Sequence, residues 1–173
     1  MLKALIIGVS LFSVTAAVAQ TDPAPAASST AMQVTDPQDF ADMAASSNMF
    51  EIESSKLALE KSSNADVLSF AQHMIDDHGK ASDQMMAAAE TDGITPATTM
   101  QAADQDMLDN LSGMEGEAFD QAYTSAQMDA HDKAIALFDG FGTNGQESAL
   151  KSFAAATEPT LQSHHDELAA MAE

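Results

Sequence analysis

Three histidines and one glutamate fall at positions where the helical periodicity of the sequence predicts apolar residues. In the run NADVLSFAQHMIDDHGKASDQMM, His78 lies four residues after Met74 on a face that is otherwise apolar. The same spacing places His131 and His164 on the apolar faces of two later segments. Glu51 lies on or beside the apolar stripe of an earlier segment. Inward imidazole and carboxylate groups indicate either a bound metal ion or a buried hydrogen-bond network.

Two methionines lie close to these histidines in the sequence. Met74 is one turn before His78 and Met128 one turn before His131, and thioether sulfur with imidazole nitrogen is a reasonable copper(I) set. Methionine is also a flexible core residue, and a chain with 12 of them places some beside a histidine by chance. The predicted cofactor is a transition metal ion (copper, zinc or iron). The predicted ligands are Glu51, His78, His131 and His164, with Met74 and Met128 as candidate soft ligands.

Several classes of chemistry lack their motifs in this sequence. A di-iron carboxylate bundle uses two Glu-x-x-His motifs, but the residues three before the inward histidines are Ile75, Met128 and Leu161. The chain has no cysteine, no G-x-S-x-G and no Gly-rich phosphate loop. The sequence therefore predicts a metal-binding protein that is not an enzyme. A non-catalytic protein with a metal-free histidine network is the alternative.

The charge balance is strongly acidic. The formal net charge is −21, from 27 acidic residues and 6 lysines, with no arginine. Nucleic-acid binding needs a clustered positive surface, so a nucleic-acid partner is not expected. Adhesion to an anionic membrane surface is disfavoured for the same reason. The acidic residues are interpreted mainly as a solvated, repulsive surface.

The N-terminal residues have the pattern of an export signal. MLKALIIGVSLFSVTAAVAQ joins one lysine to an apolar run that ends in an A-x-A site. Residues 1–19 are predicted to be a signal peptide cleaved after Ala19, which indicates a periplasmic protein without stable membrane insertion. Residues 20–35 are predicted to be a flexible linker, and residues 36–173 the folded domain.

The elements that must position the four polar residues are helices. Amphipathic periodicity with turn residues between the segments predicts helices over about 37–61, 64–91, 95–112, 117–139 and 147–171. Pro159 lies inside the last segment and predicts a kink or a restart there. This pattern predicts an all-α, ferritin-like antiparallel four-helix bundle with an extra short helix. These bounds place His131 closer to its connecting loop than His164, a mismatch that approaches ~10 Å at about 1.5 Å per residue.

The sequence resembles the exported bacterial family called domain of unknown function 4142, whose members often carry an outer-membrane label. The resemblance covers about residues 36–172 and implies a ferritin-like bundle; it implies no activity, because the function of the family is not established. One departure is Ala130-His131, where similar proteins have Asp-His. The matching phrases are Phe40, NMFEIESSKLALEKSSN around Glu51, Phe70-Ala71 with Asp77-His78, Phe119–Tyr123, Met128–His131, Phe153-Ala154, and Pro159-Thr160-Leu161 with His164.

Two functions therefore follow as hypotheses. The first is a periplasmic protein that stores, buffers or delivers a transition metal at a mid-bundle histidine and glutamate layer. The second is an envelope or stress-associated protein in which the same residues form a structural hydrogen-bond network.

Overall fold

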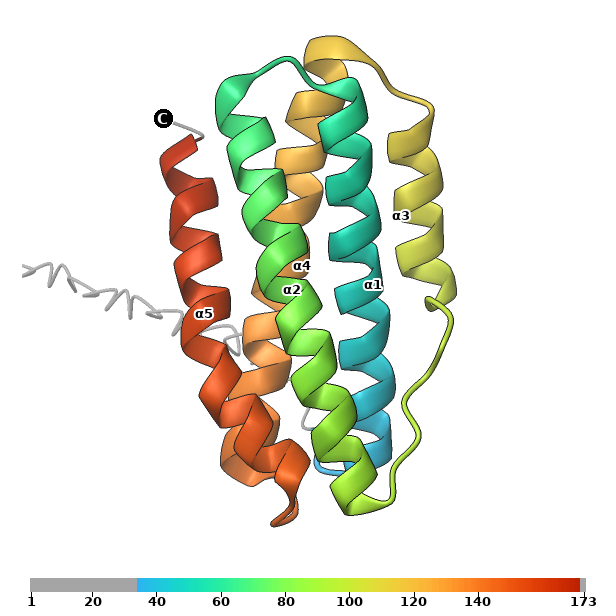
Figure 1. Ribbon diagram of the computed structural model, residues 1–173, viewed down its shortest axis with the longest axis vertical. Helices are drawn as coiled ribbons and strands as arrows, with labels where there is room; N and C mark the ends of the chain where they lie inside the picture. The colour runs from blue at the N-terminus through green and yellow to red at the C-terminus, as the bar shows by residue number, and fades with distance from the viewer. Residues whose placement is uncertain (1–33, 172–173) are drawn as a thin grey trace, which may run out of the picture.

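The computed structural model describes residues 34–171, and over these residues the chain forms helices and no strands. The predicted all-α class is confirmed. The predicted signal peptide and residues 20–33 of the predicted linker lie outside the described residues. The helices are α1 (Pro37–Lys61), α2 (Ala65–Asp92), α3 (Ala102–Ser112), α4 (Gly116–Asn144) and α5 (Ala149–Met171) (Figure 1).

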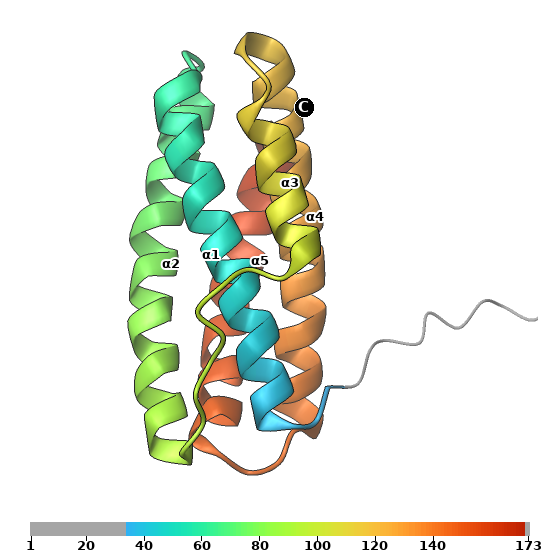
Figure 2. The same ribbon diagram turned by 90° about the vertical axis from the view of Figure 1, so that its right-hand side faces the viewer.

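Each of the four long helices packs against two others. α1 contacts α2 and α4, and α5 contacts the same two helices, so α1 and α5 lie diagonally opposite. In Figure 2, α1 and α5 run upward while α2 and α4 run downward. The connection from α2 to α4 therefore returns along the length of the molecule, and it contains α3, which packs mainly on α1.

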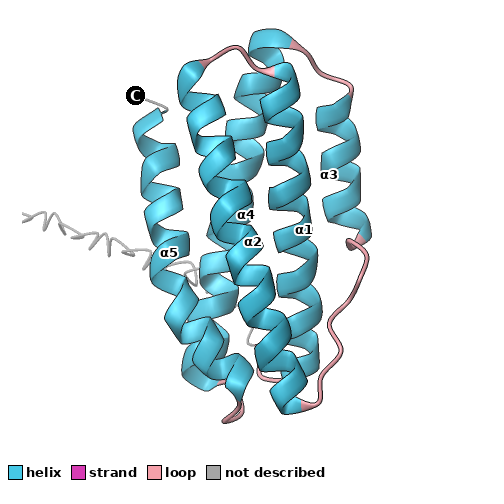
Figure 3. Ribbon diagram, viewed as in Figure 1, coloured by secondary structure: helices cyan, strands magenta, loops and turns pink. Residues whose placement is uncertain are grey.

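Local sequence signals set the ends of the first two helices. Asp36 caps α1, since its carboxylate accepts hydrogen bonds from the backbone N–H groups of Gln38 (2.9 Å) and Asp39 (3.3 Å). Gly93 ends α2 with a φ of 70°, a left-handed conformation that glycine adopts without steric cost. Short loops join the other helices at their ends, whereas the longer loop between α2 and α3 runs along the side of the bundle (Figure 3).

The third helix begins later than predicted, at Ala102 rather than near Thr95. The segment before it is held along α1 by side chains of that helix. Asp42 Oδ1 accepts from the backbone N–H of Ala97 (2.8 Å), and Ser46 Oγ accepts from that of Gln101 (2.7 Å). These bonds satisfy two backbone N–H groups from outside the segment, so the segment is stable without forming a helix.

The fourth helix ends later than predicted, at Asn144 rather than near Asp139. It continues through Gly140 and Gly142, although glycine weakens a helix, because tertiary packing stabilises this end. Phe141 is fully buried and stacks on Phe40 at 4.2 Å between ring centroids. α5 is likewise uninterrupted, since the helix runs through Pro159 without a break.

The apolar interior consists of two clusters, one toward each end of the long helices. The N-terminal half of α1 contributes to the first cluster, and the C-terminal half of α1 contributes to the second. No described helix combines the length and apolar character needed to cross a membrane. The first cluster includes Phe40, Ala44, Met85, Ala134, Phe138, Phe141, Leu150 and Leu161. The second includes Phe50, Val67, Phe70, Met74, Phe119, Tyr123, Ala130 and Leu168.

Candidate metal centre

The four predicted polar residues lie at the boundary between the two apolar clusters. On α2, α4 and α5 the polar residue lies between members of the two clusters, and on α1 Glu51 directly follows Phe50 of the second cluster. On α4, for example, Ala130 belongs to the second cluster, Ala134 to the first, and His131 lies between them. The set is Glu51 on α1, His78 on α2, His131 on α4 and His164 on α5, and each is at most 5 % exposed.

The three imidazole rings form a nearly equilateral triangle. Their centroids lie 5.4 Å (His78–His164), 5.5 Å (His131–His164) and 5.7 Å (His78–His131) apart. One ligand atom from each ring lies within 4.8 Å of the others, close enough for one metal ion. A nitrogen at the usual ~2.0–2.1 Å from zinc puts its ring centroid roughly 3.2 Å from the ion, so tetrahedral imidazoles have centroids about 5 Å apart. The triangle is close to that spacing.

The predicted mismatch along the second helix pair is absent. His131 lies thirteen residues before the end of α4, and His164 lies fifteen residues after the start of α5. Because α4 extends beyond its glycines, the two histidines are at nearly the same height above their connecting loop.

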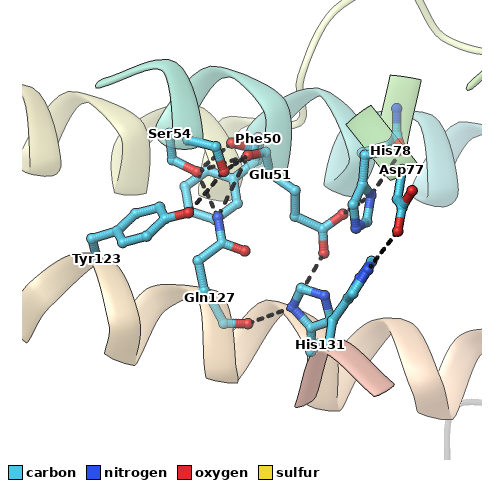
Figure 4. Close-up of polar contacts among 11 residues, drawn as sticks. Phe50, Glu51, Ser54, Asp77, His78, Tyr123, Gln127 and His131 are labelled. Atoms are coloured by element: carbon cyan, nitrogen blue, oxygen red, sulfur yellow. Dashed lines mark hydrogen bonds and ion pairs between the residues drawn. The ribbon is translucent and has the colours of Figure 1, made fainter. Parts of the chain in front are cut away.

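Each imidazole donates one N–H to an acceptor on the outside of the triangle. His78 Nδ1 lies 3.0 Å from Glu51 Oε2 and 3.0 Å from Asn48 Oδ1. His131 Nδ1–H donates to the backbone carbonyl of Gln127 at 2.8 Å, a bond drawn in Figure 4. His164 Nε2–H donates to Asp77 Oδ2 at 3.3 Å.

These outer bonds determine where the lone pairs point. A carboxylate or a carbonyl can only accept, so the outer nitrogen of each ring carries a proton, and in a neutral ring the other nitrogen then has a free lone pair. Those other nitrogens are His78 Nε2, His131 Nε2 and His164 Nδ1, and all three are buried without a hydrogen-bond partner among the described residues. Three acceptors cannot bond to one another, so three neutral rings leave three buried lone pairs without a donor among the described residues.

Burial also sets the protonation states. It lowers the pKa of His131 and of His164 below the ordinary value, so both rings are neutral at neutral pH. Burial alone would raise the pKa of Glu51, but His78, followed by the other two imidazoles, brings it below its ordinary value. The hydrogen bond from Lys80 lowers the pKa of Asp77. The neutral rings of His131 and His164 therefore lie beside the ionised carboxylates of Glu51 and Asp77.

Glu51 faces the outer side of the rings. Its Oε2 accepts from His78, and its Oε1 lies 3.9 Å from Nδ1 of His131, the nitrogen that faces away from the free lone pair (Figure 4). A carboxylate in this place orients imidazole ligands and raises their basicity. Direct ligation by Glu51 stays a prediction, as does ligation by Met74 and Met128, which pack in the second apolar cluster.

A second polar group adjoins the centre on the side of the second cluster. Ser55 Oγ lies 2.8 Å from the hydroxyl of Tyr123, and Gln127 Nε2 donates to Ser54 Oγ at 2.9 Å. Burial raises the pKa of Tyr123, so its hydroxyl stays protonated. Gln127 joins this group to the centre, because its backbone carbonyl holds His131 (Figure 4).

Sequence reasoning did not assign the outer partners Asn48, Asp77 and Gln127. Asn48 and Gln127 offered one usable signal, since each precedes a predicted site residue by three or four positions on the same helix face. Asp77 gave no such signal, because it pairs with a histidine on another helix.

Comparison with known proteins places the chain in a family. The model of the family described as "Domain of unknown function (DUF4142)" matches residues 21–171, which confirms the resemblance noted in the sequence. No curated protein and no solved structure matches the chain.

Proposed function

The chain belongs to the DUF4142 family, whose description assigns no function, and we propose that it is an exported, ferritin-like metal-binding protein. His78, His131 and His164 hold one transition metal ion, and the protein stores, buffers or delivers that ion rather than catalysing a reaction.

The observation that supports this proposal best is the set of three buried lone pairs. A metal-free hydrogen-bond network requires a donor for each acceptor, and the outer bonds use the proton of every neutral ring. One water molecule could donate to two of the three nitrogens and would leave the third unsatisfied, at a cost of about 1–3 kcal/mol. One metal ion satisfies all three, so metal binding is favoured over the structural network.

The donor set limits the ion. Neutral imidazoles suit zinc, copper, nickel and iron(II), and the absence of cysteine from the sequence removes thiolate ligands. The space beside Glu51 and His78 is a cavity of about 20 Å³, enough for one water molecule. A larger substrate has no room on that side, which supports binding over catalysis.

The helix order supports the ferritin-like arrangement of the proposal. Ferritin-like bundles have two antiparallel helix pairs joined by one long crossover. Here α1 and α2 form one pair, α4 and α5 the other, and the α3-containing segment joins them. Export rests on the sequence of residues 1–19 alone.

The test is metal analysis of protein purified without a histidine tag or chelator, followed by titration with zinc, cobalt(II), iron(II) and copper(I). The chain supplies a matched pair of variants, His164→Ala in the centre and His165→Ala beside it. We expect one ion per wild-type chain, retained by His165→Ala and lost from His164→Ala with the helical circular dichroism unchanged. If the wild-type chain binds every ion only as weakly as an ordinary acidic protein surface, the metal-binding proposal is wrong. The histidines would then form a structural hydrogen-bond network.

A further inference from the structure

The three histidines differ in their distance from solvent. His131 is fully buried, whereas His164 lines a surface depression of about 470 Å³ between α2 and α5. His73, Asp77 and Glu167 line the same depression. The outer nitrogen of His164 bonds to Asp77, whose side chain is 40 % exposed, so this one hydrogen bond connects the buried triangle to solvent.

The depression carries the side-chain types that bind cations. His73 Nδ1 lies 3.5 Å from Glu167 Oε1 across the two helices, and both side chains are exposed. Asp77 lies one turn after His73 on α2. Three groups able to contact a divalent cation therefore surround the outer edge of His164, whose inner nitrogen is buried and without a partner.

α5 is weakened where it borders this depression. Pro159 lines it and has no N–H, so the carbonyl of Ala155 lacks its usual helical donor. A local bend of α5 away from α2 therefore breaks fewer backbone hydrogen bonds here than in a helix without proline.

Lys80 places a positive charge on one side of Asp77, and that side faces away from His73 and Glu167. Its ammonium lies 2.9 Å from Asp77 Oδ1 and borders a second depression, which shares Asp77 and Thr160 with the first. A fixed positive charge repels an approaching cation, so the side with His73 and Glu167 is the electrostatically open one.

From these features, and resting on the proposed function, we propose that divalent cations enter and leave the triangle between α2 and α5. Glu167, His73 and Asp77 capture the cation at the surface, and His164 is the first of the three ligands to receive it. Lys80 competes for Asp77 and slows the exchange.

The test is the rate of cobalt(II) binding to the metal-free chain, followed by the visible absorption of the bound ion after rapid mixing. Glu167→Gln and His73→Gln leave the triangle and its outer partners intact. We expect both to slow association and dissociation by up to about tenfold, with the dissociation constant unchanged, because Glu167→Gln removes an attracting charge and His73→Gln removes an imidazole ligand. Lys80→Gln is expected to accelerate both.

The matched control is the His165–Asp132 pair on the other side of α5, where Nε2 lies 3.2 Å from Oδ1. Asp132→Asn removes the same charge as Glu167→Gln, so it corrects for long-range attraction, and it should leave both rates at their wild-type values.

The outcomes separate the two proposals. Equal rates for Glu167→Gln and Asp132→Asn, in a chain that binds cobalt(II) at the triangle, would overturn the route and leave the metal site standing. A wild-type chain that binds no cobalt(II), zinc or copper(I) at all would overturn both.

Discussion

At the residue scale, Glu51 is the buried carboxylate of the proposed metal centre. The residue is almost fully buried, and within residues 34–171 its ion-pair partners are histidines, not lysines. An isolated buried charge is costly, so its place beside two imidazoles is favourable only where those rings donate to it or hold a cation. His78 supplies one such donor, and a cation held by the rings would stabilise the carboxylate further.

Glu51→Gln tests this role at the residue scale. The amide oxygen can still accept from His78, but the negative charge is lost, so metal affinity should fall about 10- to 100-fold. Competition with a chelator of known affinity measures the change. Glu53→Gln is the control, since Glu53 lies two positions away on α1, is exposed and pairs only with Lys56. Complete loss of the ion, as for His164→Ala, would instead identify Glu51 as a direct ligand.

At the scale of the helices, close packing of α4 on α5 explains why glycines lie inside a helix. A Cβ added at Gly142 would lie 3.2 Å from the backbone nitrogen of Ala155, whereas one added at Gly140 would have no neighbour within 4 Å. Gly142 therefore allows the two helices to approach, and Gly140 has no such packing role. The approach stabilises the last turn of α4, so the helix continues to Asn144.

Replacement by alanine should therefore affect the free energy of unfolding differently at the two glycines. Gly140→Ala should raise the free energy of unfolding by about 0.5–1 kcal/mol, because alanine favours the helix. Gly142→Ala should lack this gain or lower stability, because the backbone of Ala155 must move. Denaturant unfolding of both variants measures the difference, and equal stabilisation would show that the helices do not need the glycine.

Contacts between residues that are distant in the sequence set the limit of what helical periodicity could predict. Local patterns placed α1 and α2 well, since Asp36, Pro37 and Gly93 are signals that act within one turn. The end of α4 and the start of α3 depend on Ala155, Asp42 and Ser46, which are distant in the sequence. The inward positions of the histidines follow from helical spacing, but their common height depends on these distant contacts.

For the whole molecule, the buried centre predicts how stability depends on pH. Burial lowers the pKa of His131 and His164 in the folded chain below the ordinary value of 6.5. As pH falls below about 6.5, the unfolded chain therefore binds protons that the folded chain does not, and the folded state loses stability. Glu51 and Asp77 have lowered pKa values, so their contribution is present above about pH 4.5 and is lost on further acidification.

The metal-free chain should therefore lose stability in two stages on acidification, the histidines first and the carboxylates second. Unfolding by urea at a series of pH values, with a chelator present, measures both stages. His131→Leu and His164→Leu remove one titrating group each, so each should flatten the dependence between about pH 7 and pH 5 and leave the second stage in place. Unchanged slopes in both variants would contradict buried neutral histidines. With metal bound, the first stage should be steeper, because protonation of the imidazoles also releases the ion and removes its stabilising effect on the folded state.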